Sequence, residues 1–107
     1  MEERLRKRIV QHIVKNLLDV QVLKILDKEP MWGYKIKRFI EETSGLKIRH
    51  GTLYPLLDWL EQEGFIESHE QTHGRRKRRI YSLTNRGRSF LEDYRGIIKE
   101  QIFDDGK

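Results

Sequence analysis

Apolar residues recur at helical spacing in four stretches of the chain. In residues 2–17 one stripe has a period of four and a second adjoins it: Leu5, Ile9, Ile13 and Leu17, with Val10 and Val14. This wide apolar face predicts a helix. Asp19 either caps a second helix that runs to residue 28 or lies within one long helix that ends before Pro30, and the pattern leaves both open.

Two shorter helices are predicted within residues 32–64. The helical pattern restarts after Trp32, places Ile36, Phe39 and Ile40 on one face, and stops at Gly45. The next helix opens at residues 50–52 and buries the leucines at positions 53, 56, 57 and 60. Pro55 is compatible with this helix if it lies in the first turn, where its missing N–H has no partner.

Strand-forming residues replace the helical pattern after residue 64. The run IYSL at positions 80–83 and the polar turn residues at 71–74 predict a β-hairpin over residues 65–83. A last helix over residues 84–103 follows, with one apolar face. We therefore expect a single domain over residues 1–107 that is mainly α with a small two-stranded antiparallel sheet: a helix-turn-helix at 32–64 followed by a wing.

The third predicted helix is the candidate for reading DNA bases. Its leucines face the core, which leaves the polar first turn free to enter a major groove. The predicted base-reading residues are His50, Thr52 and Tyr54. The alternative is an ordinary helix of a small helical domain that reads nothing.

Charge is concentrated rather than spread. The formal net charge is +5, and residues 75–79 are five consecutive cations after Gly74. The like charges of such a run repel one another, which costs stability unless an anion binds there, so we predict phosphate contacts. Because the side chains of a strand alternate between its two faces, about half of these cations would contact phosphate. The predicted phosphate-contacting set is Tyr34, Lys35, Arg38, Lys47, Arg49, Arg75, Arg76, Lys77, Arg78 and Arg79. For Tyr34, a core position is an equal alternative.

Other classes of function find little support in the residues. The chain has no cysteine, which excludes disulfides and thiol nucleophiles. His69 and His73 lack further ligands, and we see no catalytic or cofactor-binding motif, so we expect no metal, no cofactor and no enzyme activity. Without an apolar stretch of about 18 residues or a secretory signal, we expect a cytoplasmic protein with no membrane partner.

Several of these motifs together resemble the PadR family of winged-helix transcriptional regulators. The segments that carry the resemblance are GYKI at 33–36, GTLYPLL at 51–57, LE at 60–61, GFI at 64–66, and the stretch from Gly74-Arg75 through Tyr81, Leu83-Thr84 and Gly87-Arg88. It covers roughly residues 17–91. The chain departs from the family at Asp58-Trp59, where members commonly carry a basic pair, so no phosphate contact is implied there. It resembles the short subgroup with a single C-terminal helix.

The resemblance implies a homodimeric repressor assembled through the N- and C-terminal helices. With 36% hydrophobic residues, the chain is lean enough to share part of its core with a second copy. The implied interface residues are Leu5, Ile9, Ile13, Leu17, Phe90, Leu91, Tyr94, Ile97, Ile98 and Ile102.

We therefore expect a sequence-specific regulator that binds a near-palindromic operator in double-stranded DNA. Some family members sense small apolar or aromatic molecules, which suggests an effector cavity in the dimer, lined by Tyr94, Ile98 and residues of the first helix. Two alternatives stay open: a winged-helix protein-interaction module, and a nonspecific architectural DNA binder.

Overall fold

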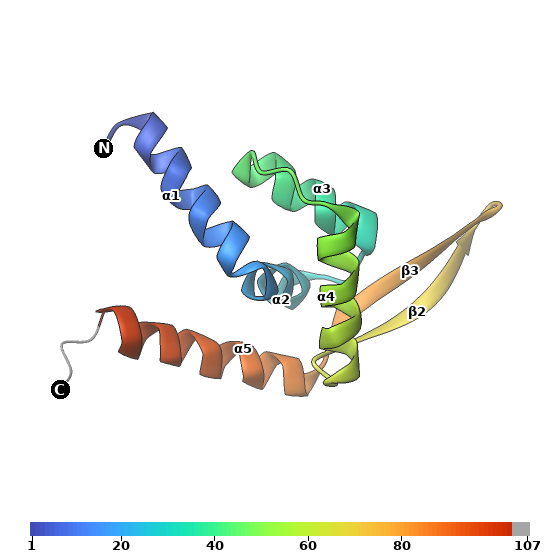
Figure 1. Cartoon of the computed structure of the whole chain (residues 1–107). Helices are drawn as coiled ribbons and strands as arrows, with labels where there is room; N and C mark the ends of the chain where they lie inside the picture. The colour runs from blue at the N-terminus through green and yellow to red at the C-terminus, as the bar shows by residue number, and fades with distance from the viewer. Residues whose placement is uncertain (104–107) are drawn as a thin grey trace.

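Residues 1–103, which the computed structural model describes, form five α-helices and a small sheet (Figure 1). In chain order the elements are α1 (Glu3–Asn16), α2 (Leu18–Lys28), β1 (Met31–Trp32), α3 (Gly33–Ser44), α4 (His50–Gln62), β2 (Ile66–His73), β3 (Arg76–Leu83) and α5 (Asn85–Ile98). A wider π-helical turn, Lys99–Phe103, continues α5. The predicted order of helices and hairpin is therefore confirmed.

The N-terminal segment is broken into two helices. Leu17 leaves the helical conformation, with φ −120° and ψ 44°, and α2 starts at the next residue. Asp19 lies in the first turn of α2 and accepts a hydrogen bond from the Val20 N–H at 2.9 Å, but it is not the capping residue. The break lets α2 turn into the core while α1 runs outward.

The sheet has three strands, where two were expected. Strand β1 pairs antiparallel with β3, Met31 opposite Tyr81 and Trp32 opposite Ile80, which gives the order β1-β3-β2. Two residues are too few to display an alternating pattern, so this strand leaves no periodic signal in the sequence. Its consequence is that the start of α3 is fixed to the base of the wing.

Strands β2 and β3 form a long regular hairpin. Their register runs from Ile66 opposite Leu83 to His73 opposite Arg76, which leaves Gly74 and Arg75 as a two-residue turn. Gly74 has φ +65°, as the first central position of a type II′ turn requires. Most of the cationic run thus lies in β3 rather than at the tip, and the hairpin extends away from the helices (Figure 1).

The core lies between α2, α3, α4 and the base of the sheet. Its fully buried side chains include Leu23, Ile36, Leu53 and Leu57. Two details of the predicted helical pattern are wrong. Phe39 was placed on the inward face of its helix, yet it is about half exposed. Pro55 is the sixth residue of α4 and not in its first turn, so α4 lacks one interior hydrogen bond.

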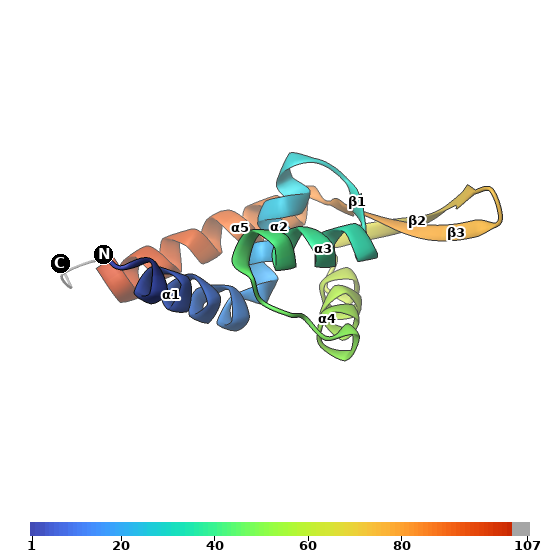
Figure 2. The same ribbon diagram turned by 90° about the horizontal axis from the view of Figure 1, so that it is seen from above.

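Helices α1 and α5 extend from the core in the same general direction, away from the wing (Figures 1 and 2). The described chain measures 52 × 33 × 22 Å along its principal axes, which reflects these projections. Within residues 1–103, no helix combines the length and the apolar character that crossing a bilayer demands.

Candidate nucleic-acid interface

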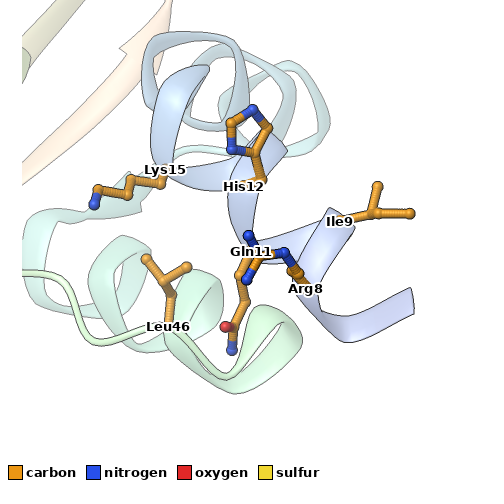
Figure 3. Close-up of a pocket in the computed structure, with 6 residues that line it drawn as sticks. All are labelled: Arg8, Ile9, Gln11, His12, Lys15 and Leu46. Carbon is orange, nitrogen blue, oxygen red and sulfur yellow. The ribbon is translucent and has the colours of Figure 1, made fainter. Parts of the chain in front are cut away.

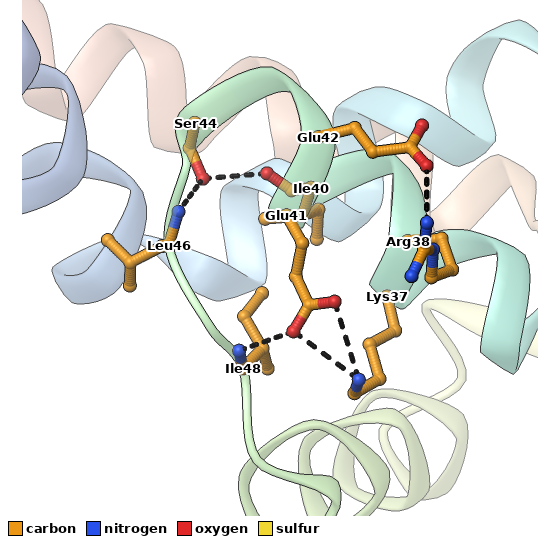
Figure 4. Close-up of polar contacts among 8 residues, drawn as sticks. All are labelled: Lys37, Arg38, Ile40, Glu41, Glu42, Ser44, Leu46 and Ile48. Atoms are coloured by element: carbon orange, nitrogen blue, oxygen red, sulfur yellow. Dashed lines mark hydrogen bonds and ion pairs between the residues drawn. The ribbon is translucent and has the colours of Figure 1, made fainter.

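The connection between α3 and α4 places the first turn of α4 at the surface. Gly45 ends α3 in the left-handed conformation, with φ +78°, and the buried Ser44 hydroxyl accepts a hydrogen bond from the Leu46 N–H at 3.1 Å. Further along, the Ile48 N–H donates to the Glu41 carboxylate at 2.8 Å (Figure 4). Helix α4 then begins at His50, and no side chain caps its N-terminus.

The three predicted base-reading residues differ in their surroundings. His50 and Thr52 are exposed in the first turn of α4. Tyr54 is half-buried instead: its ring lies against Gly33, and the His50 ring stacks on it with centroids 4.1 Å apart. Burial raises the pKa of the Tyr54 hydroxyl above its usual value of 10.0. Tyr54 is therefore placed to support His50 rather than to reach outward itself.

The five cations of the wing divide into two groups. Arg75, Arg76 and Lys77 are exposed at and beside the turn. The guanidinium of Arg78 stacks over the Trp32 ring, 3.9 Å from its centroid. Arg79 donates to the Ser68 hydroxyl at 2.9 Å and lies 3.7 Å from the Glu70 carboxylate. The last two cations are thus partly engaged within the chain.

Of the predicted phosphate contacts outside the wing, some already pair with carboxylates. Lys35 lies 4.0 Å from Glu29, and Arg38 donates to Glu42 at 2.9 Å, which raises the pKa of Arg38 further. These pairs are exposed, so they are worth little and a phosphate can compete for both cations.

The remaining members of the set, Lys47 and Arg49, are exposed on the connection that enters α4. Tyr34 is half exposed and its ring lies tilted against that of Trp32, with centroids 5.5 Å apart, so it is a surface residue and not a core one.

Trp32 joins these parts and was not among the predicted site residues. A hollow of about 280 Å³ lies where β1, α3, α4 and β3 meet, lined among others by Trp32, Tyr34, Tyr54 and Arg78. The signal for Trp32 in the sequence is its place directly before Gly33, where a side chain beyond Gly would collide with Tyr54. Trp59, whose role the sequence left open, packs edge-on against Phe65 at 6.2 Å.

The residues implied for a dimer interface also divide. The α1 residues Leu5, Ile9 and Ile13 are exposed large apolar side chains, and so are Ile97 and Ile102 near the other end of the chain; Leu17 and Ile98 are intermediate. The other three members pack within the chain, although only Leu91 is buried. Leu91 has no exposed surface, Phe90 stacks on Phe65 at 4.0 Å, and Tyr94 packs edgewise on Phe90 at 5.9 Å. Leu91 is therefore a core residue of the single chain and has no surface left for a partner.

A second hollow lies between α1 and the connection that leads to α4 (Figure 3). It has a volume of about 660 Å³. Its lining combines the apolar side chains of Ile9 and Leu46 with the basic or polar side chains of Arg8, Gln11, His12 and Lys15. The effector cavity expected from the sequence is lined by Tyr94, Ile98 and the first helix; residues of that helix line this hollow, but Tyr94 and Ile98 do not.

Comparison with known proteins places the chain among regulators. The transcriptional regulator PadR-like family matches over residues 22–93. The negative transcriptional regulator PadR of Bacillus subtilis is 31% identical over 88 residues, which cover 79% of this chain and 47% of that protein. The chain spans about half the length of the curated relatives it matches.

Solved structures agree on the fold. The protein TA0346 from Thermoplasma acidophilum has a TM-score of 0.74 at 29% identity, with 82% of this chain and 85% of that chain covered. Bacillus subtilis PadR in complex with operator DNA has a TM-score of 0.71 at 29% identity, covering 83% of this chain and 50% of that chain. Taken with the family match over the helix-turn-helix and the wing, these likenesses show that the chain belongs to the PadR-like family of transcriptional regulators.

Proposed function

We propose that this protein is a transcriptional regulator that binds double-stranded DNA through α4 and the wing. The observation that carries the proposal is the arrangement of exposed groups: the polar first turn of α4, with His50 and Thr52, is preceded by Lys47 and Arg49. A helix presented by its N-terminal turn beside cations is the arrangement that reads a major groove while holding the backbone. The related Bacillus subtilis PadR has been crystallised with operator DNA.

The wing supplies affinity without sequence information in this proposal. Arg75, Arg76 and Lys77 have no carboxylate partner among the described residues and extend on a hairpin away from the helices (Figure 1). Cations of this kind bind backbone phosphates and release counterions from the DNA. Arg78 contributes less, because its guanidinium stacks on Trp32. The exposed pair of Arg79 with Glu70, like that of Arg38 with Glu42, leaves Arg79 open to a competing phosphate.

The regulator acts as a homodimer in this proposal, and the exposed apolar faces of α1 and α5 support that assembly. Ile9 and Ile13 on α1 are close to half exposed, and Ile97 on α5 is 56% exposed. Both helices run away from the wing, so two copies joined through them keep their DNA-binding parts apart (Figure 2). A twofold dimer binds a near-palindrome with half-site centres about one helical turn, roughly 34 Å, apart.

Repression is the expected outcome of binding. The curated Bacillus subtilis relative is a negative regulator, and a dimer seated on an operator blocks access to the DNA it covers. A small apolar or aromatic effector remains a prediction. Titrating such compounds against the protein–operator complex tests it, and unchanged operator affinity for all of them counts against it.

The salt dependence of duplex binding tests the DNA-binding role. We expect the logarithm of the affinity to fall linearly with the logarithm of salt concentration. Arg75→Ala and Arg76→Ala should each weaken binding to every sequence and reduce the slope by about one phosphate contact. Arg95→Ala is the matched control, because it removes the same charge from α5, where Arg95 pairs with Glu92 at 2.8 Å.

Three other results would redirect the proposal. An unchanged slope in both wing variants refutes the phosphate role. Binding with no preference among sequences indicates a nonspecific architectural protein. Absence of duplex binding at low salt leaves the winged-helix protein-interaction module, whose basic wing meets an acidic partner.

A further inference from the structure

Helix α4, whose first turn is proposed to read bases, is entered through a short connection, residues 45–49. This connection contains Lys47 and Arg49 and is followed directly by His50, the first residue of α4. No side chain caps the N-terminus of α4, and its first turn is closed by the N–H groups of Thr52 and Leu53, which donate to the Arg49 carbonyl at 2.9 and 3.1 Å. Arg49 itself belongs to the connection, so the path of the connection helps to set where this turn lies.

Glu41 of α3 holds the connection at its last buried point. Its carboxylate accepts the Ile48 N–H at 2.8 Å and lies 3.3 Å from the Lys37 ammonium, one turn earlier on the same helix (Figure 4). The Glu41 side chain is only 10% exposed. Ile48 is buried in the core, so its backbone N–H relies on this partner in place of water.

The neighbouring Glu42 shows what an ordinary carboxylate on this helix does. It forms an i,i+4 pair with Arg38 at 2.9 Å, and its side chain is 64% exposed. Among the described residues, its hydrogen bond and ion pair are with Arg38 and not with the connection. Glu41 and Glu42 thus share charge, helix and position in sequence, but only Glu41 reaches the segment that enters α4.

We infer that Glu41 is a positioning residue for sequence reading, an inference that rests on the proposed function. It touches no DNA; it fixes the Ile48 backbone, and with it the approach of His50 and Thr52 to the bases. This role predicts the direction in which the DNA affinity changes when the carboxylate is removed. Near a polyanion, a carboxylate by itself repels, so its removal strengthens binding if charge is all that matters. Removal of a positioning carboxylate weakens binding to the correct sequence instead.

The test compares Glu41→Met with Glu42→Met on a duplex selected for tight binding and on a scrambled duplex. Methionine is close to glutamate in length, but its thioether sulfur is uncharged and only a weak acceptor for the Ile48 N–H. For E41M we expect about tenfold weaker binding to the selected duplex, little change on the scrambled one, and an unchanged salt slope, because a hydrogen bond to a charged group is lost but no phosphate contact. For E42M we expect equal or tighter binding to both duplexes.

Circular dichroism at the assay temperature establishes that each variant is folded. Equal affinities of E41M and wild type for the selected duplex overturn the inference, and so does a loss of equal size on both duplexes. If E41M does not fold, Glu41→Gln decides, because its neutral amide oxygen is a weaker acceptor for the Ile48 N–H than the carboxylate. Amide exchange at Ile48 and preference for the selected duplex should change together in E41Q, and a change in one without a change in the other overturns the inference.

Failure of the proposed function gives a different result. In that case the wild-type chain itself does not distinguish the two duplexes, whatever residue stands at position 41, and the inference falls with it.

Discussion

Gly87 offers a stability test in which two physical arguments predict opposite signs. It is the third residue of α5, where alanine normally stabilises a helix relative to glycine by about 1 kcal/mol. In this fold, however, a Cβ on Gly87 would lie 1.9 Å from the Phe65 carbonyl oxygen and 2.7 Å from a methyl of Leu83. Real Cβ contacts essentially never fall below 3.0 Å. Backbone must therefore move when alanine is introduced.

The displacement reaches the hydrogen bonds that attach α5 to the wing. The Thr84 hydroxyl donates to the carbonyls of Gly64 and Phe65, at 2.7 and 3.0 Å, and accepts the Gly87 N–H at 2.9 Å as the N-cap. Overpacking costs about 1–3 kcal/mol and loss of a cap about 1 kcal/mol. Subtracting the gain in helix propensity leaves a destabilisation of about 1–3 kcal/mol for Gly87→Ala, out of a total of about 5–15 kcal/mol.

Gly96 is the matched control in the same helix. A Cβ there meets nothing within 4 Å, so Gly96→Ala should stabilise the chain by about 0.5–1 kcal/mol. At a fixed protein concentration, thermal unfolding followed by circular dichroism should show the Tm of G87A lowered by about 5–20 °C and that of G96A raised by a few degrees. A G87A variant as stable as wild type would refute the close approach of α5 to Phe65.

Further outcomes concern specificity, assembly and pH. Thr52→Ala should change the preferred bases and leave the salt slope unaltered in competition binding; a uniform loss on all sequences contradicts base reading. Ile13→Ser should shift the protein toward monomer in sedimentation equilibrium, because Ile13 is an exposed apolar residue of α1; an undisturbed dimer argues against this interface. The Ile48 N–H and then the Lys37 ammonium hold the pKa of Glu41 below its ordinary value of 4.5, although burial by itself raises it. The ionised Glu41 therefore stabilises the fold above its ordinary pKa, and this stabilisation is lost as the pH falls. Between about pH 5 and pH 3, the free energy of unfolding measured in urea should fall more for wild type than for E41Q, and equal losses would refute this role of Glu41.

The helices and the wing follow from the sequence because they depend on local patterns. Apolar spacing indicates α1, α3, α4 and α5, and the glycine at position 45 marks the end of α3. The strand β1 does not follow, since it exists only through pairing with β3, far along the chain. For the same reason the sequence does not predict which wing cations are engaged within the chain: Arg78 stacks on Trp32, which lies beside it only because β1 pairs with β3.

The interface residues were harder to assign because one apolar stripe can serve two surfaces. On α1, Val14 packs into the core while Ile9 and Ile13 remain exposed. On α5, Leu91 is buried and Ile97 is not. Spacing alone groups them, and only the tertiary packing separates them. The role of Glu41 could not be predicted from the sequence, because the path of the connection decides whether the Ile48 N–H reaches its carboxylate.

The central claim is that two copies of this chain read a symmetric DNA sequence with α4. Selection of bound duplexes from a random pool tests it most directly. We predict enrichment of a near-palindrome with half-site centres about one helical turn, roughly 34 Å, apart. A single asymmetric half-site contradicts the dimer, and a pool that stays random after repeated rounds contradicts sequence reading itself.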